Sequence, residues 1–173
     1  MKEISVNEAF GAAPPRSAAV LCLNGPGGSS DIILTDWFTW LNLKRQPMIS
    51  FSMPRNTSLG IKISEGDPLV LAFPPVKVAL KYKQGIRTAA AGEQKELPGW
   101  VNTVSAPELS VQIPGESAVV LSCTLAGAYN YPFKKVRIFN CNLEKALAGR
   151  PEAAASDPAA ALPEPEEEDE ILT

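Results

Sequence analysis

The strongest anion-binding chemistry in the sequence lies in the segment Arg55-Asn56-Thr57-Ser58. A guanidinium group, two hydroxyls and the free backbone amides of a predicted helix start converge there, and Lys62 follows about one helical turn later. Such a set could hold a phosphate group. Taken alone, the pattern favours a capped helix whose Arg and Lys side chains are solvated. The segment is therefore a candidate anion site that needs support from elsewhere in the chain.

Aromatic residues are concentrated just after Thr35-Asp36, in the run Trp37-Phe38-Thr39-Trp40. A strand is predicted from Ile32 to Thr39, so successive rings should face opposite sides of a sheet. At least one ring could border a flat ligand. For most such rings, and for Phe38 in particular, packing in the core is the favoured interpretation.

The segment from Met48 to Met53 alternates apolar and small polar residues with a period of two. This period predicts a strand with one apolar face, while the opposite face carries Ser50 and Ser52. The two hydroxyls therefore share one side of the predicted sheet.

Several classes of site are excluded or disfavoured by composition. The chain has no histidine, which excludes Ser-His-Asp and Cys-His catalysis and histidine-ligated metal sites. The cysteines Cys22, Cys123 and Cys141 are far apart, so we expect small buried thiols in a reducing cytoplasm rather than zinc ligands or disulfides. The glycine-rich run from Gly25 to Ser30 lacks a Gly-Lys-Ser/Thr ending and leads into a strand, which favours a hairpin turn over a phosphate loop. We assign no metal site and no catalytic residue.

Short apolar or alternating runs separated by Gly, Pro and Asn predict a mainly β protein. The strands expected besides those above are Ser17 to Asn24, Leu69 to Phe73, Glu108 to Ile113, Ser117 to Ala126 and Lys135 to Asn142. A short helix should begin at Asn56-Thr57-Ser58. A second should run from Pro75 to Gln84, with Val76, Ala79 and Leu80 on a different face from Lys77 and Lys81. These elements together suggest a closed or nearly closed barrel.

The net charge of −3 conceals two regions of opposite character. Residues 1–149 are slightly basic and have the size of one domain, whereas residues 150–173 hold eight acidic residues and one Arg. We expect the second region to be a disordered tail. An interaction arm for a basic partner is one interpretation of it, and a solubilising tail is the favoured one.

The sequence gives no indication of export, of a membrane span or of nucleic-acid binding. Glu3 and Glu8 stand where a signal peptide would need a basic start, and no apolar run reaches the length of a bilayer span. The small basic patch Lys134-Lys135-x-Arg137 is more typical of a solvated strand edge than of a nucleic-acid surface. We therefore expect a cytoplasmic protein.

The run DIILTDWFTWLNLKRQPMISFSMPRNTSLGIKISEGDPLVLAFP resembles the signature half of the flavin reductase-like, FMN-binding split-barrel family, which includes flavoredoxin. The later stretch SAPELSVQIPGESAVVLSCTLAGAYNYPFKKVRIFNCNL is similar to the closing strands of that family. The matching pieces are Thr35-Asp36-Trp37, Pro47, Met48 to Ser52, Thr57-Ser58, Ile63 to Leu71, Ala106-Pro107-Glu108-Leu109 and Ser122-Cys123-Thr124. The resemblance covers residues 18–143, most of the predicted domain.

The resemblance implies a homodimer of split β-barrels, each with two or three short helices, and FMN bound near the subunit interface. The phosphate would lie on Arg55, Thr57 and Ser58, with Lys62 as a further candidate, and the ring would lie along Thr35 to Thr39 and against the two serines. The implied cofactor-binding residues are Thr35, Asp36, Trp37, Phe38, Thr39, Ser50, Ser52, Arg55, Asn56, Thr57, Ser58 and Lys62.

The activity implied by the resemblance is hydride transfer from NAD(P)H to the flavin. The absence of histidine is compatible with it, because the cofactor carries out the chemistry and the protein supplies position and electrostatics. Two alternatives remain open from the sequence. One is a barrel that binds flavin without catalysis, and the other is a flavin-free split barrel that serves as an interaction module.

Overall fold

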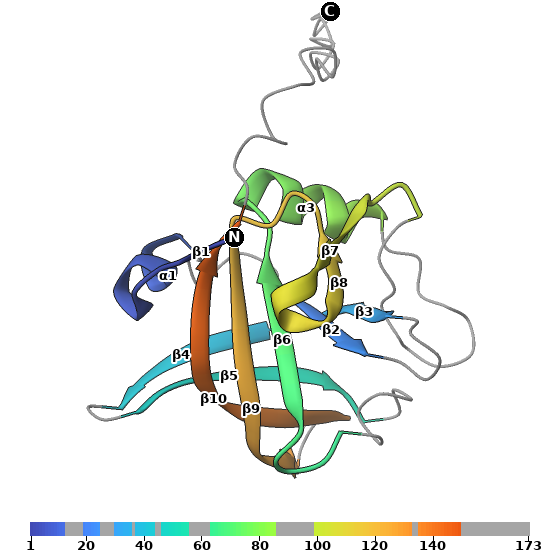
Figure 1. The fold of residues 1–173 in the computed structure, drawn as a ribbon. Helices are drawn as coiled ribbons and strands as arrows, with labels where there is room; N and C mark the ends of the chain where they lie inside the picture. The colour runs from blue at the N-terminus through green and yellow to red at the C-terminus, as the bar shows by residue number, and fades with distance from the viewer. Residues whose placement is uncertain are drawn as a thin grey trace, which may run out of the picture.

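The computed structural model describes residues 1–12, 19–24, 30–35, 37–43, 46–55, 63–85, 99–132 and 135–149 (Figure 1). The elements are β1 (Lys2–Glu3), α1 (Val6–Ala12), β2 (Val20–Asn24), β3 (Ser30–Leu34), β4 (Trp37–Leu43), β5 (Gln46–Pro54), β6 (Pro68–Phe73), α3 (Val76–Gly85), β7 (Thr103–Ala106), a 3-10 turn (Pro107–Leu109), β8 (Val111–Pro114), β9 (Val119–Asn130) and β10 (Val136–Ala148). The protein is mainly β, as the sequence predicts. The predicted helix start at residues 56–58 and the predicted tail, 150–173, lie outside the described residues.

One antiparallel sheet forms most of the molecule, with the strand order β3-β2-β6-β9-β10-β5-β4 and with β1 added to β10. Strands β3 and β4 are its two outer strands, although only residues 35 and 36 separate them in the chain. Two intervening residues allow a Cα–Cα separation of at most about 11 Å between Leu34 and Trp37. The sheet must therefore curl until its edges approach each other, and Figure 1 shows this half-open barrel.

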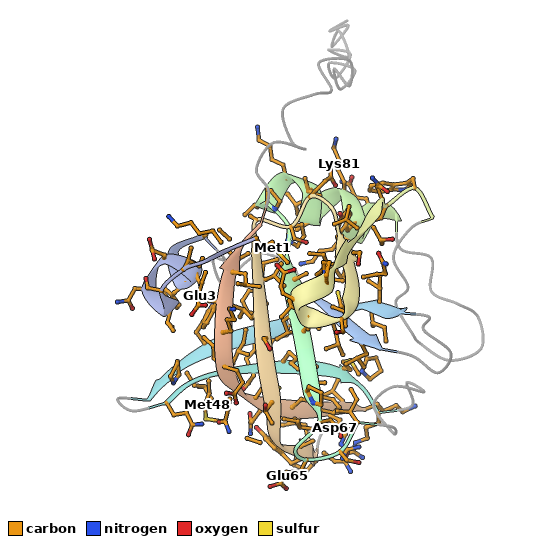
Figure 2. The ribbon with its side chains drawn as sticks, viewed as in Figure 1. Met1, Glu3, Met48, Glu65, Asp67 and Lys81 are labelled. Carbon is orange, nitrogen blue, oxygen red and sulfur yellow. The ribbon has the colours of Figure 1, made fainter. Side chains whose placement is uncertain are left out.

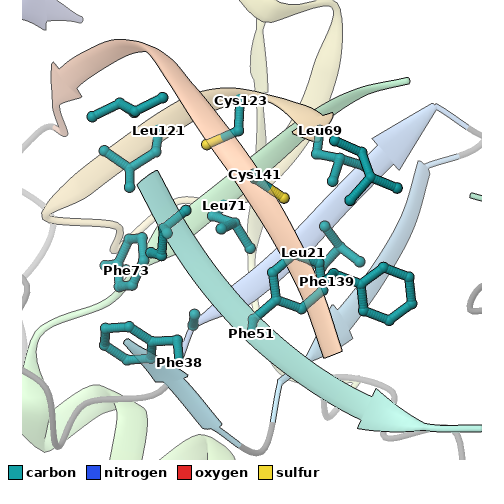
Figure 3. Close-up of a cluster of buried hydrophobic side chains, with 14 of the residues drawn as sticks. Leu21, Phe38, Phe51, Leu69, Leu71, Phe73, Leu121, Cys123, Phe139 and Cys141 are labelled. Carbon is teal, nitrogen blue, oxygen red and sulfur yellow. The ribbon is translucent and has the colours of Figure 1, made fainter. Parts of the chain in front are cut away.

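The inside of the curled sheet is filled by side chains from alternate strand positions. Phe51 stacks on Phe139 with ring centroids 5.1 Å apart, and Phe38 meets Phe73 edge to face at 5.0 Å. Figure 3 shows these four rings around the aliphatic residues and the thiols of Cys123 and Cys141. The period-two pattern of the segment around Phe51 is thus confirmed.

A second, smaller cluster lies on the other side of β2, β6 and β9, under helix α3 and the β7–β8 hairpin. From α3, Ala79 and Tyr82 enter this cluster, and Tyr82 is fully buried. Its hydroxyl donates a hydrogen bond to Oε2 of Glu116 at 3.1 Å, and its ring lies 5.6 Å from that of Trp100. This layer covers the part of the outer face formed by β2, β6 and the start of β9.

Two predicted strands differ from those observed. The segment Ile32 to Thr39 is not one strand, because the chain changes sheet edge at residues 35 and 36. The predicted strand from Glu108 begins only at Val111, since Pro107 starts a 3-10 turn and Ser110 adopts a left-handed conformation with φ of 55°. The two C-terminal strands are present and longer than predicted.

The predicted hairpin between residues 24 and 30 agrees with the antiparallel pairing of β2 and β3, in which Asn24 faces Ser30. Helix α1 was not predicted, although its start carries a Ser-x-x-Glu capping pattern. The amide of Ser5 donates to Oε2 of Glu8 at 2.7 Å, and the amide of Glu8 donates to Oγ of Ser5 at 3.3 Å. The hydrogen bonds from Ser5 lower the pKa of Glu8.

Helix α3 is confirmed within one residue at each end, and of its predicted apolar face only Ala79 is buried against the sheet. Val76 and Leu80 lie on the exposed side, with 42% and 53% of their surface accessible. The sheet-facing positions are instead taken by Ala79 and Tyr82. Within the described ranges no helix is long and apolar enough to cross a membrane.

Candidate functional site

The outer face of the barrel wall, opposite the phenylalanine core, brings together residues from four strands. Residues paired across antiparallel strands point to the same side of a sheet, so the register fixes which side chains are neighbours. The first row of this outer face is Trp37, Ser52, Ile138 and Tyr129, and the second row is Thr39, Ser50, Asn140 and Gly127. The two rows are about 7 Å apart along the strands.

The two serines of β5 are more buried than their outward position suggests, with 4% of Ser50 and 8% of Ser52 accessible. Oγ of Ser50 donates a hydrogen bond to Oδ1 of Asn140 at 2.5 Å. The hydroxyls of Ser52 and Thr39 make no hydrogen bond to the residues that the structure describes. Two hydroxyls with no partner in the described part of the chain thus lie in adjacent rows of this face.

The aromatic segment of β4 alternates as predicted. Trp37 is 47% exposed on the outer face, whereas Phe38 is buried inside the barrel and Trp40 stacks on Phe73. Phe38 therefore belongs to the core and does not reach the outer face. Trp37 is the ring of this segment that could lie against a flat ligand.

Thr35 is also set apart from the outer face. Its side chain is buried, and its Oγ1 donates to the carbonyl of Ala19 at 3.1 Å, beside the backbone hydrogen bond between the same two residues at 2.8 Å. This pair of bonds ties the end of β3 to the chain just before β2. The Thr35 hydroxyl is therefore engaged in holding the barrel edge.

Arg55, the first residue of the predicted anion site, follows β5 and is half-buried against the β9–β10 hairpin. Its Nη2 donates to the carbonyl of Tyr131 at 2.7 Å and its Nε to that of Val136 at 3.4 Å, while its amide donates to the carbonyl of Lys135 at 2.9 Å. These side-chain bonds use two of the five N–H donors of a guanidinium group. Arg55 thus binds the β9–β10 hairpin through two N–H groups, and its other guanidinium N–H groups can donate to a further acceptor.

The remaining predicted contacts cannot be placed. Asp36, Asn56, Thr57, Ser58 and Lys62 lie outside the described residues. Arg55 lies three residues beyond Ser52, just past the end of β5 and about 10 Å further along the chain. The structure therefore brings Trp37, Thr39, Ser50 and Ser52 onto one face. Arg55 lies where this face ends, just beyond the last residue of β5.

The contribution of β9 and β10 to this face was not predicted from the sequence. Asn140 accepts the hydrogen bond of a residue 90 positions earlier in the chain. The alternation of Asn140 and Asn142 with the buried Phe139 and Cys141 is the signal that could have identified a polar face on this strand. Its partner strand cannot be identified from spacing alone.

Other reactive groups in the described ranges do not form a second site. The structure contains no group of His, Cys, Asp and Glu residues there that could hold a metal ion. The three cysteines are free and buried, as predicted. Burial raises the pKa of Cys141 to about 12 and the pKa values of Cys22 and Cys123 well above the ordinary range, so none is a thiolate nucleophile at neutral pH.

No protein-family model matches the sequence, and no curated protein matches it. Solved structures with a similar fold include the NADH:FAD oxidoreductase SgcE6 of Streptomyces globisporus C-1027, with a TM-score of 0.60 and 12% identity over 82% of this chain and 80% of that one. The flavin reductase of a styrene monooxygenase from Pseudomonas putida S12 gives a TM-score of 0.59 and 11% identity over 85% and 89%.

Flavoredoxin from Methanosarcina acetivorans is a third similar structure, with a TM-score of 0.56 and 17% identity over 86% of this chain and 76% of that one. At these identities the likeness concerns the fold. The chain has the split-barrel fold of flavin reductases and flavoredoxin, which confirms the fold that the sequence resemblance implied.

Proposed function

We propose that this protein binds FMN on the outer face of its barrel and transfers hydride from NADH or NADPH to the flavin. The observation that carries this proposal is the clustering of Trp37, Thr39, Ser50 and Ser52 on one face that ends at Arg55. The fold adds support, because similar structures are named as flavin reductases, and one of them is described in complex with NAD and FAD fragments.

The residues present fit the chemical parts of FMN. A flavin has a flat ring with hydrogen-bonding groups on its edge and a phosphate at the end of its side chain. Ser52 and Thr39 offer hydroxyls without a described protein partner, and Trp37 offers an exposed aromatic surface. In this proposal Arg55 donates to the phosphate with the N–H groups that the hairpin does not use.

The other predicted ligands complete the phosphate corner of the proposal. Thr57 and Ser58 would donate their hydroxyls, Lys62 would add a positive charge, and Asn56 and Asp36 would border the site. The Ser50–Asn140 hydrogen bond would hold the floor of the ring site in one arrangement. When bound, the flavin supplies the redox chemistry, and these residues bind it, orient it and limit the access of water.

The proposal includes a homodimer that covers part of the outer face. Trp37, Leu41 and Tyr129 are all large, exposed by more than a third, and placed on this face. Large exposed side chains gathered on one sheet face are typical of an interaction surface. The three free thiols support a location in the reducing cytoplasm.

The test is an absorption spectrum of the purified full chain with and without added FMN, followed by measurement of NADH and NADPH oxidation. We expect a bound flavin spectrum and oxidation that requires FMN. A yellow protein that oxidises neither nucleotide would indicate a binding module without catalysis. A colourless protein that never quenches the fluorescence of FMN would indicate a flavin-free interaction module.

A further inference from the structure

Helix α3 exposes an apolar strip bordered by lysines. At 100° per residue, Val76 and Leu80 lie together on the solvent side, with Lys83 on one flank and Lys77 and Lys81 on the other. All five side chains are exposed. Figure 2 shows Lys81 pointing away from the sheet. We refer to these five residues as the α3 strip.

The α3 strip has no covering element among the residues that the structure describes. Val76 and Leu80 remain 42% and 53% exposed, and no ion pair of Lys77, Lys81 or Lys83 is formed within the described part of the chain. The helix itself carries no acidic residue. A pair of apolar side chains between cations fits a ligand that combines carboxylates with apolar groups.

The chain passes directly beside this helix where the described part ends. The amide of Gly149 donates to the carbonyl of Ala118 at 2.8 Å, and the amide of Ala118 donates to the carbonyl of Phe73 at 2.8 Å. Only Pro74 and Pro75 separate Phe73 from the first residue of α3. Figure 1 shows β10 ending near the start of this helix. The described part of the chain therefore ends near the start of α3.

The composition of the last ten residues is complementary to the α3 strip. The sequence from Glu164 to Thr173 reads EPEEEDEILT, in which six carboxylates are followed by Ile171 and Leu172. The sixteen residues from Gly149 to Glu164 span roughly 20 Å as a flexible chain, and α3 is about 15 Å long. The acidic run can thus reach any position along the helix.

We propose that residues 164–173 dock on the α3 strip of their own chain, with the carboxylates on the lysines and Ile171 and Leu172 against Val76 and Leu80. The docked segment covers the exposed apolar pair and neutralises the lysines of this helix. This assigns a binding role to a tail whose composition alone favours a solubilising one. The inference is independent of flavin binding.

A nitroxide at the end of the full chain tests the proposal. The native cysteines are buried, so a Thr173→Cys variant can be labelled at the new thiol, and the label broadens amide signals of nearby residues in NMR spectra. We expect strong broadening over residues 76–84 at low salt and its loss at high salt, because exposed charge pairs are screened. Broadening that does not include α3 would overturn the proposal.

Matched charge reversals provide the control. Lys81→Glu should reduce the fraction docked by about fivefold, the change that corresponds to about 1 kcal/mol of exposed ion pairing. Lys135→Glu makes the same charge change at the far end of β10 and should leave the broadening unaltered. An equal loss in both variants would overturn a specific contact with α3.

Two further outcomes would assign the α3 strip to another occupant and overturn the proposal. Broadening that grows with protein concentration and disappears on dilution with unlabelled protein would indicate the tail of a second copy. Absence of broadening together with binding of the full chain to phosphatidylserine vesicles, abolished by Lys81→Glu, would indicate a membrane surface.

Discussion

The two serines of β5 provide a direct comparison between a structural and a ligand-binding hydroxyl. Ser50 donates to Asn140 at 2.5 Å, whereas Ser52 has no hydrogen-bond partner in the described part of the chain. Ser50→Ala leaves the Asn140 carbonyl oxygen without its donor and should lower the free energy of unfolding by about 1–2 kcal/mol. Ser52→Ala breaks no described bond, and its effect should stay within about 0.5 kcal/mol.

Flavin binding should show the opposite order. Ser52→Ala should weaken FMN binding by about five- to tenfold, the value of one hydrogen bond of about 1 kcal/mol. Ser50→Ala should weaken it less, because the proton of that hydroxyl is already committed to Asn140. The assays are urea unfolding, followed by tryptophan fluorescence, and titration of FMN fluorescence.

Two results would contradict the roles assigned to Ser50 and Ser52. A loss of stability in Ser52→Ala as large as that in Ser50→Ala would show that the hydrogen bonds of β5 are assigned wrongly. Unchanged FMN affinity in a stable Ser52→Ala variant would remove this hydroxyl from the flavin site.

Three further changes test the core, the outer face and the first helix. Phe51→Ala removes a fully buried ring stacked on Phe139 and should lower the free energy of unfolding, measured with urea, by about 3–5 kcal/mol. A decrease below about 1 kcal/mol would contradict the assignment of Phe51 to the core. Gly127→Leu adds a side chain where a Cβ meets nothing within 4 Å, so the fold should persist while FMN affinity falls at least about tenfold. Gly11→Leu, also unobstructed, is its control, and equal affinities in the two variants would exclude the second row as the ring site. Because the hydrogen bonds from Ser5 lower the pKa of Glu8, its capping contribution is present above the ordinary value of 4.5 and is lost as pH falls through the lowered pKa. The protection of the α1 amides relative to their intrinsic exchange rate should therefore fall in that range, and Glu8→Ala should abolish this pH dependence. An unchanged protection profile in Glu8→Ala would contradict the capping role.

The predictable part of the fold came from local patterns. The period-two alternation from Met48 to Met53 defined both faces of β5, and the flanking prolines and glycines marked strand ends and helix α3. The resemblance to a family predicted the split barrel. The break after Thr35 was not predictable in this way, because it follows from the curling of the whole sheet, which places β3 and β4 at opposite edges.

The site was predictable only on the strands whose own sequence alternates. The placement of Ser50 and Ser52 opposite the apolar face of their strand and the alternation of Trp37 with Phe38 were predicted correctly, but the burial of the serines and the role of Asn140 depend on β9 and β10. The exposure of Val76 and Leu80 on α3 was likewise not predictable from hydrophobicity alone, because Ala79 and Tyr82 are the residues of the helix that enter the cluster on the sheet.

The central claim is that FMN binds this chain with its phosphate held at Arg55 and Thr57. The most direct test is a titration of FMN into the wild type and an Arg55→Ala/Thr57→Ala variant, with thermal unfolding measured on both because Arg55 also holds the β9–β10 hairpin. We predict saturable binding by the wild type and a loss of roughly 2–4 kcal/mol in the folded variant. Equal affinities in the two proteins, or no binding by the wild type, would contradict the claim.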